Sequence, residues 1–556
     1  MSKKIGQSKS NKFLPIIAPL SAALTVIVMA PYILMDSANP IKLLVVSTFG
    51  FGYILTFVIN FRQIKNEKNN LILWVSLSFI VLSVFVTFTT QNELSQQLYG
   101  IAGRQTGLIL HLGLFGLLIA GNLFASQSLL ISSMRIFQVS GVIIGSYGLI
   151  QIFGLDPLTW SSNPGWVAAT LANPNFFSSF MGMLVCVTLP YIISAKKLSS
   201  KVLYLLSVLI CVFIIIKTSS QQGIILVLLG VAITLYFYIK SKNLPKGWLW
   251  SYVSLAVLGF IVLLLDIFQK VPWEPILYKA SVSARGDYWR AGLAVIEKHP
   301  LTGVGFDGLR EQFGLVREPI TLTRGDQLDL DAAHNVYIDK GIAGGVPLLI
   351  LYLIMIIIVA FAVKKLVSNM SSFKPELVAV ISCWIAWAVQ GVISIDNAGL
   401  ASWGWYLSGL ITGLAAVSSK STQEYSEPRV KIKSGLKPYI AGVLIGAIVA
   451  SPLITREYRY VKSIESGDAK ALQAAALQFP QDVFRIGRAA EILKEYKIQK
   501  ESLFLAQAGV KNFPESYAAW AVLYTSPWAS ETERAQAKVK LFELDPFRAK
   551  YQGLVD

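Results

Sequence analysis

Charged residues are scarce in this sequence. Asp, Glu, Lys and Arg make up 15% of its 556 residues, against about 25% in an ordinary soluble domain. Hydrophobic residues make up 54%, and apolar runs of roughly 17 to 25 residues, each long enough to cross a bilayer, recur along most of the chain. A chain of this kind cannot cover its apolar surface in water. The composition therefore excludes a soluble globular protein and predicts a membrane protein.

Cysteine is also rare, since the chain has only Cys186, Cys211 and Cys383, each inside an apolar segment. Their number and spacing exclude a disulfide framework and a Cys-x-x-Cys metal site, so we expect buried core side chains. Acidic residues are too few to balance the basic ones, which leaves a net charge of +17. Because the Lys and Arg lie in short clusters between apolar runs, we predict no nucleic-acid partner.

The apolar runs predict an all-α fold, a polytopic transmembrane bundle of about 12 to 13 spans. The first run follows a basic tail and is too long for the apolar part of a signal peptide, so we expect an uncleaved first span. The predicted membrane domain covers residues 1–455. Its expected spans are 13–35, 41–61, 71–90, 107–126, 131–154, 175–194, 202–217, 223–240, 249–269, 341–363, 376–395, 401–418 and 438–455.

Lys and Arg cluster in alternate connections between these spans, and the N-terminal tail belongs to the same set. By the positive-inside rule these connections face the cytoplasm. The Arg104 loop, residues 155–174, residues 270–340 and the IDNAG turn near 395–399 are then extracytoplasmic. We therefore expect a multi-pass protein of the plasma (inner) membrane with a cytoplasmic N-terminus.

Residues 456–556 are polar and have the apolar spacing of helices. Pro480, Pro514 and Pro546 lie 34 and then 32 residues apart, which is similar to the period of tetratricopeptide repeats. A plain helical tail is the alternative. With thirteen spans this C-terminal domain lies outside the cytoplasm, although the basic REYRYVK segment after the last span favours the opposite side. Such a domain is a possible binding site for a protein partner.

Residues 270–340 are the only long polar excursion within the membrane region, and loops of this length usually carry function. They contain SARGDYWRAGLAVIEKHPLTGVGFDGL and DAAHNVYIDKGIAGGVPLL. These stretches resemble the O-antigen ligase and Wzy-type polymerase superfamily, whose pattern is Arg, Trp, His-Pro-x-x-Gly-x-Gly and then His-Asn-x-Tyr. The matching positions are Arg285, Trp289, His299, Pro300, Gly303, Gly305, His334, Asn335 and Tyr337.

Three further segments fit the same resemblance, which covers roughly residues 70 to 415. They are GRQTGL with Arg104, TLANPNFFSSF with Asn173 and Asn175, and SIDNAGLASWGW with Asp396. The resemblance implies transfer of a glycan from a polyprenyl-pyrophosphate carrier to a glycan, lipid or protein hydroxyl at the outer membrane face. Membrane lipids surround such an enzyme, and the resemblance implies no cofactor and no metal.

Such a reaction needs cations for the pyrophosphate leaving group. Arg285 is the leading expected ligand, because a guanidinium presents a planar fork to phosphate oxygens. Arg104 is the second and Arg290 a third. The alternatives are a headgroup anchor for Arg285, a snorkelling side chain for Arg104, and stabilisation of the helix that carries Trp289 for Arg290.

His334 is the expected general base, because an imidazole with an ordinary pKa near 6.5 can take a proton from an attacking hydroxyl. A helix-start residue that bonds its neighbours is the alternative. His299 is expected to end a helix before Pro300, and His111 lies within a span. Asn335, Tyr337 and Trp289 are expected to support the site.

Asn173 and Asn175 form an NPN turn that binds substrate or simply shapes the chain. Asp329 and Asp331 are expected to be solvated, and not to bind a metal. The sequence departs from the family at TSSQQG, where Gln222 stands in place of an Arg that would help to hold pyrophosphate. Lys217, a few residues earlier, is the expected substitute.

Several functions remain open from the sequence. Within the same class, the chain is a ligase, a Wzy-type polymerase or a protein O-oligosaccharyltransferase. A solute or anion transporter is the alternative of another class, against which stands the shortage of acidic residues in mid-span. An inactive membrane scaffold is the third, because of the missing Arg at Gln222.

Overall fold

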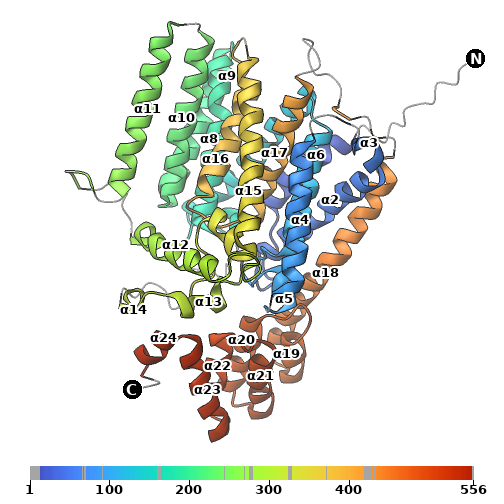
Figure 1. Ribbon diagram of the computed structural model, residues 1–556, viewed down its shortest axis with the longest axis vertical. Coiled ribbons are helices and arrows are strands. Elements are labelled where there is room, and N and C mark those ends of the chain that lie inside the picture. The colour runs from blue at the N-terminus through green and yellow to red at the C-terminus, as the bar shows by residue number, and fades with distance from the viewer. Residues whose placement is uncertain are drawn as a thin grey trace, which may run out of the picture.

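The computed structural model describes residues 13–65, 67, 70–90, 92–158, 165–242, 244–267, 270–274, 280–323, 329–370, 372–418, 428–430, 432 and 434–553. Throughout these segments the regular elements are helices, and no strand occurs in them. Figure 1 shows a bundle of long helices with a cluster of shorter helices at one end. The all-helical architecture is therefore confirmed.

Nine helices of the described chain are long and apolar enough to cross a membrane. They are α2 (Asn39–Ile59), α4 (Leu71–Thr89), α7 (Gln127–Ile152), α8 (Pro174–Ser194), α9 (Leu198–Lys217), α10 (Gln221–Ser241), α15 (Val336–Ser368), α17 (Ala398–Val417) and α18 (Leu436–Ser466). Further apolar helices lie at the remaining predicted spans: α1 (Leu14–Ile27), α6 (Leu108–Leu123), α11 (Lys246–Ile267) and α16 (Pro375–Gln390).

The first predicted span is too long, because α1 has only 14 residues and the chain then turns. The fully buried ammonium of Lys42 in α2 donates to the carbonyl oxygens of Thr25, Val26 and Val28 at 2.7, 3.1 and 3.0 Å. It thus satisfies carbonyl groups that the end of a helix leaves open. Pro31 has no N–H with which to continue the helix. A count of apolar residues does not detect either cause.

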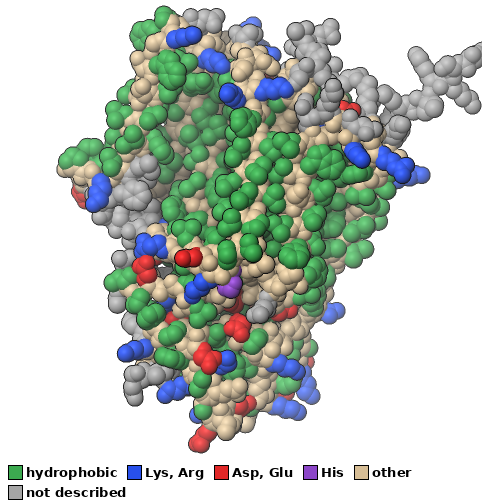
Figure 2. All heavy atoms as spheres, in the orientation of Figure 1, with side chains coloured by type: hydrophobic (Ala, Val, Ile, Leu, Met, Phe, Trp, Pro, Cys, Tyr) green, Lys and Arg blue, Asp and Glu red, His purple; other side chains and the backbone are tan. Residues whose placement is uncertain are grey.

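Glycines allow close packing at the centre of the bundle. A Cβ on Gly50 of α2 would lie 2.2 Å from the backbone of Gly113 in α6, and one on Gly409 of α17 would lie 2.0 Å from the carbonyl oxygen of Leu118. Small residues at helix crossings are typical of bilayer proteins. Hydrophobic side chains cover the visible face of the bundle, whereas charged side chains are frequent over the cluster of shorter helices (Figure 2).

Helix α15 is broken near its start, where Gly344–Gly345 leave helical geometry. The HPLTGVG segment docks at this break, and the N–H of Val304 donates to the carbonyl of Ile342 at 2.8 Å. Gly303 and Gly305 have φ values of +60° and +89°, which side chains other than glycine rarely adopt. These glycines of the motif are therefore turn formers that fix the polar loop against α15.

The polar loop forms helices of its own: α12 (Ala280–Lys298), α13 (Leu309–Val316) and α14 (Ile320–Thr323). Because α12 ends at Lys298, the prediction that His299 terminates a helix is confirmed. Short elements elsewhere are α3 (Phe61–Lys65), α5 (Leu94–Tyr99) and η2 (Ala169–Leu171).

The C-terminal domain begins without a break, because α18 continues from the bundle to Ser466. Consecutive helices then pack on one another around two small apolar cores. They are α19 (Ala469–Ala476), α20 (Val483–Glu495), α21 (Gln499–Asn512), α22 (Tyr517–Tyr524), α23 (Glu531–Leu544) and α24 (Pro546–Tyr551). The helical tail is confirmed, and its relation to tetratricopeptide repeats stays a prediction.

Candidate functional site

Polar segments that are far apart in the sequence meet where the bundle joins the C-terminal domain. The Arg104 guanidinium donates to both carboxylate oxygens of Asp331, at 2.9 and 3.2 Å. Burial acts to lower the pKa of Arg104, but the Asp331 carboxylate outweighs it and raises the pKa above its ordinary value. The loop before α6 is thus joined to the loop before α15 by a two-point ion pair.

Arg285 projects from α12 and is 8% exposed. Burial lowers its pKa, and its Nε atom is buried without a hydrogen-bond partner in the described structure. A buried cation that lacks an opposite charge is costly for a protein. Such a group is suited to an anionic ligand, which would supply the missing charge.

The positive charges of Arg104 and Arg285 both act to lower the pKa of the His334 imidazole. Burial is the largest cause of the lowered pKa, and the Asp331 carboxylate opposes it. Nδ1 lies 3.1 Å from the carbonyl oxygen of Ala332; with the proton on Nδ1, Nε2 keeps its lone pair. His334 is therefore neutral at pH 7 and able to accept a proton.

The backbone of His334 is strained, with a φ of +52°. Residues other than glycine rarely adopt this conformation, and such strain is often found at functional sites. Asn335 follows directly and caps α15, its side-chain oxygen accepting from the N–H groups of Tyr337 and Ile338 at 3.0 and 3.2 Å. The ring of Tyr288, from α12, lies 5.4 Å from the imidazole ring. These contacts fix the direction of the imidazole.

A small cavity with a volume of about 40 Å³ lies beside the ion pair of Arg104 and Asp331. Asp339, Lys340 and Asp396 line its walls as well. This volume accommodates a few water molecules, at about 10–15 Å³ each, and is too small for a sugar. In the described conformation the cavity is therefore closed to a sugar, and the guanidinium of Arg104 is bound to Asp331.

Lys340 is the centre of a buried network. Its ammonium pairs with the Asp396 carboxylate and donates to Nε2 of His111 at 2.8 Å. Nδ1 of His111 lies 3.0 Å from the carbonyl oxygen of Gly107. The network joins α6, α15 and the turn before α17, and thereby brings Asp396 to the cavity wall.

The other predicted supporting residues have structural contacts. The Tyr337 hydroxyl donates to the carbonyl of Ala388 in α16 at 2.9 Å. Trp289 packs against the apolar core formed by α12 and α13. Asn173 caps α8 by accepting the N–H of Asn175 at 2.8 Å, and Asn175 accepts the Ser220 hydroxyl at 2.7 Å. These contacts orient the loops on the same end of the bundle.

Gln222 is buried inside the bundle. Its oxygen accepts from the Ser179 hydroxyl at 2.9 Å, and its nitrogen donates to the Ile393 carbonyl at 3.3 Å. The neutral amide thus joins α8, α10 and the turn before α17, where a charge would need a partner. Lys217, at the exposed end of α9, lies over the ring of Phe213. No described contact joins it to Arg285, Arg104 or His334.

Arg290 is half exposed and forms ion pairs with Asp287 and Glu318, so its charge is already balanced. The prediction of solvated carboxylates in the DLD segment agrees with Asp329, whose side chain is 50% exposed while it pairs with Arg548 of α24 at 2.6 Å. It is wrong for Asp331, which is partly buried in its ion pair with Arg104. No group of metal-ligating side chains occurs in the segments that the structure describes.

Sequence reasoning missed Asp331, Lys340 and His111 as members of the site. Two signals were present in the sequence. Lys340 is a charged residue at the start of a long apolar run, and His111 lies within another such run. Polar residues of this kind in membrane segments usually pair with one another. Their pairing could not be deduced without the arrangement of α6 and α15.

Residues 206–353 match a family model described as O-antigen ligase. The chain carries an O-antigen ligase family domain. The matched segment of this O-antigen ligase domain includes Arg285, His334 and Lys340, whereas Arg104, Asp396 and the C-terminal domain lie outside it. The match indicates a membrane enzyme of surface polysaccharide biosynthesis that acts on lipid-linked glycans. No curated protein matches the chain.

Proposed function

We propose that the chain is a membrane glycosyltransferase that transfers a glycan from polyprenyl pyrophosphate to an acceptor hydroxyl. The single observation that carries this proposal is the buried guanidinium of Arg285, whose Nε has no described hydrogen-bond partner, in the electrostatic neighbourhood of His334. The O-antigen ligase match over residues 206–353 supports the same reaction.

Arg285 and Arg104 are the proposed ligands of the pyrophosphate. When the bond between the anomeric carbon and the phosphate oxygen breaks, its electron pair goes to that oxygen, and negative charge grows on the leaving group. A guanidinium neutralises this charge through hydrogen bonds worth roughly 1.5–3 kcal/mol each. Arg104 must leave Asp331 to take part, so donor binding opens the ion pair. Arg290 and Lys217 would assist only from a distance, since Arg290 already pairs with Asp287 and Glu318 and Lys217 lies over the ring of Phe213.

His334 is the proposed general base. The acceptor oxygen attacks the anomeric carbon, its proton passes to Nε2 of His334, and the proton then leaves to water. The lowered pKa keeps the imidazole neutral at pH 7, as a base must be. Seven further residues are proposed to support the site by holding its segments in place. They are Asp396, Asn335, Tyr337, Trp289, Asn173, Asn175 and Gln222.

We assign the site and the C-terminal domain to the extracytoplasmic side of the plasma membrane, with about 12 to 13 spans and a cytoplasmic N-terminus. The distribution of Lys and Arg among the connections supports this orientation. We also propose that the C-terminal helices are tetratricopeptide-like repeats. Their packing in sequence order supports this relation.

The test replaces His334 with Ala and follows transfer of labelled glycan from polyprenyl pyrophosphate in membranes. We expect a loss of about 10²- to 10⁴-fold, which is the usual contribution of a general base. His299→Ala is the matched control, because His299 is an exposed histidine of the same polar loop, and it should leave transfer unchanged. Unchanged transfer in His334→Ala would remove the base assignment.

The glycans of cells that lack the protein distinguish two forms of the reaction. A missing ligase leaves long chains on the lipid carrier, whereas a missing polymerase leaves single repeat units on the acceptor. The ligase reaction is the one we propose, because the matched family model is described as O-antigen ligase.

A further inference from the structure

A second and larger cleft lies on the other side of the Arg104 loop. Its volume of about 440 Å³ falls within the range of ligand sites, roughly 300–1,000 Å³. Ala102 and Gly103 line this cleft, whereas Arg104 and Thr106 of the same loop line the small cavity near Asp331. The backbone of the Arg104 loop therefore separates the small cavity from the larger cleft. The other lining residues are Met35, Asp36, Ser37, Ala38, Asn39, Ala172, Phe484 and Arg485.

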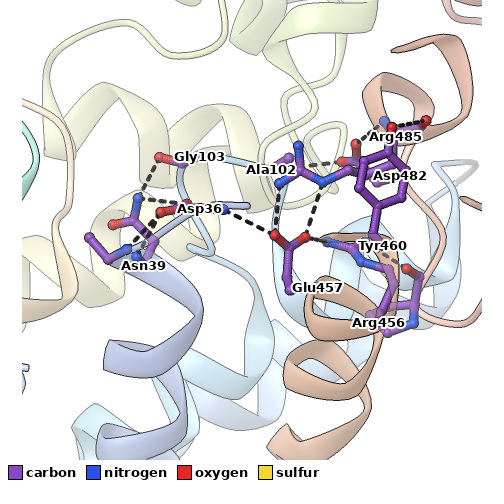
Figure 3. Close-up of polar contacts among 11 residues, drawn as sticks. Asp36, Asn39, Ala102, Gly103, Arg456, Glu457, Tyr460, Asp482 and Arg485 are labelled. Carbon is purple, nitrogen blue, oxygen red and sulfur yellow. Dashed lines mark hydrogen bonds and ion pairs between the residues drawn. The ribbon is translucent and has the colours of Figure 1, made fainter. Parts of the chain in front are cut away.

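The walls of the cleft come from the bundle and from the C-terminal domain, and polar contacts hold them together (Figure 3). The Asn39 amide donates to the carbonyl of Gly103 at 2.9 Å. The N–H of Ala102 donates to the Asp482 carboxylate of the C-terminal domain at 3.1 Å. Clefts between domains are frequent ligand sites, and such sites are usually preformed. The contacts just described hold this cleft open without a bound ligand.

The lining side chains have the chemistry that recognises a saccharide. The Ser37 hydroxyl, the amide oxygen of Asn39 and Nη1 of Arg485 match the hydroxyl groups of a sugar. The remaining polar groups of these walls already bond within the protein, since the Asn39 amide nitrogen donates to Asp36 and Gly103. Phe484 is 37% exposed and offers an apolar face to sugar C–H groups. The guanidinium of Arg310 lies over one face of this ring, 4.2 Å from its centre, and stabilises its position by a cation–π contact.

We propose that this cleft binds the saccharide of the acceptor, an inference that rests on the proposed function. The donor is held in the bilayer by its polyprenyl chain, and the cleft lies beside the polar C-terminal domain. The cleft also lacks the charge that a pyrophosphate needs, because Arg485 already donates from Nε and Nη2 to Glu457 and Asp36 adds a carboxylate. A neutral, hydroxyl-rich ligand fits both facts.

The first experiment measures transfer kinetics for Phe484→Ala with a saturating lipid-linked donor. The acceptor is the oligosaccharide released by mild acid from the envelope glycolipids of the host cell. We expect the KM for this acceptor to rise roughly tenfold while kcat and the donor KM stay unchanged. Phe484→Tyr keeps the aromatic face and should restore the acceptor KM.

The matched control for this variant is Phe504→Ala. Phe504 lies in α21 of the same C-terminal domain, is 49% exposed and does not line the cleft. Its replacement should leave the acceptor KM unchanged. An unchanged acceptor KM in Phe484→Ala, or an equal rise in the control, would overturn the proposal.

The second experiment measures binding without turnover. The three natural cysteines are buried, so Ser37→Cys introduces an accessible thiol in the cleft. We expect the released oligosaccharide to slow alkylation of this thiol at least threefold, and the polyprenyl pyrophosphate donor to leave it unchanged. Protection by donor alone, or by a peptide but not by the oligosaccharide, contradicts a saccharide site.

The two experiments separate this inference from the proposed function. If wild-type protein transfers glycan but Ser37→Cys gains no protection from the oligosaccharide, the cleft proposal fails and the enzyme assignment stands. If the oligosaccharide protects the thiol while His334→Ala retains full transfer, the cleft proposal stands and the assigned base fails.

Discussion

The junction around Glu457 and the cluster around His334 are both buried charged regions, but their charges are balanced differently. Glu457 is fully buried and pairs with Arg456 at 2.7 Å and with Arg485 at 2.9 Å. It also accepts the N–H of Asp36 at 3.1 Å (Figure 3). In the His334 cluster, Arg285 is buried with an unsatisfied Nε, and the partly exposed pair of Arg104 and Asp331 closes the site.

The difference separates a structural role from a functional one. A network in which both oxygens of the carboxylate have partners fixes one arrangement of two domains, and it leaves Glu457 itself no open position for a ligand. A buried cation with an open hydrogen-bonding position lowers the stability of the protein, and binding of an anion at that position raises the stability again. Substitutions at the Glu457 junction should therefore change stability, whereas substitutions near His334 should change activity.

The largest expected effect is on stability, for Glu457→Gln. The change leaves two buried guanidinium groups without their carboxylate, and breaking a buried ion pair on one side costs about 3–5 kcal/mol. We expect the C-terminal domain to become sensitive to protease and the unfolding temperature in detergent to fall. Glu465→Gln on the same helix is the control, since Glu465 pairs at the surface with Lys462, and should change neither measurement.

Arg285→Met is expected to affect activity and spare the fold. Loss of one transition-state cation typically costs about 10²- to 10³-fold in rate, whereas removal of an unbalanced buried charge leaves the unfolding temperature unchanged or raises it. Transfer kinetics and thermal unfolding of the same purified variant provide the comparison. A variant that unfolds and retains its specific activity would reverse the roles of the two regions.

Asp331→Asn is expected to shift the pH dependence. The Asp331 carboxylate acts to raise the pKa of His334 against the larger lowering by burial. Its removal lowers this pKa further, so the acidic limb of kcat/KM moves to lower pH than in the wild type. A pH profile of transfer measures the shift. A limb that stays in place or moves upward would show that the imidazole is not the titrating base.

The smallest effect is expected for Lys217→Gln. Lys217 is exposed at the end of α9, and its described contact is with the ring of Phe213. We expect donor KM and kcat to change by about twofold or less, because exposed charges in water interact weakly. A loss of tenfold or more would restore Lys217 as a pyrophosphate ligand and bring it into the comparison as a third cation.

Apolar run length was sufficient to locate the nine described helices that are long and apolar enough to cross a membrane, because the bilayer imposes a minimum length on every helix that crosses it. It failed at α1, where the ammonium of Lys42 ends the helix by an interaction across two elements. The motifs likewise indicated Arg104, Arg285 and His334, which the structure brings into one electrostatic neighbourhood. The partners of these residues could not be predicted. Lys340 of α15 meets His111 of α6 in the folded bundle, and Asp331 in the loop before α15 meets Arg104 in the loop before α6.

Helix α18 has 31 residues without an interruption, a length of about 46 Å at 1.5 Å per residue. Its first half lies within the bundle and its second half, beyond Pro452, carries the C-terminal domain, so one helix connects the two parts. Any tilt of the last span relative to its neighbours therefore swings α20 and, with it, one wall above the Arg104 loop.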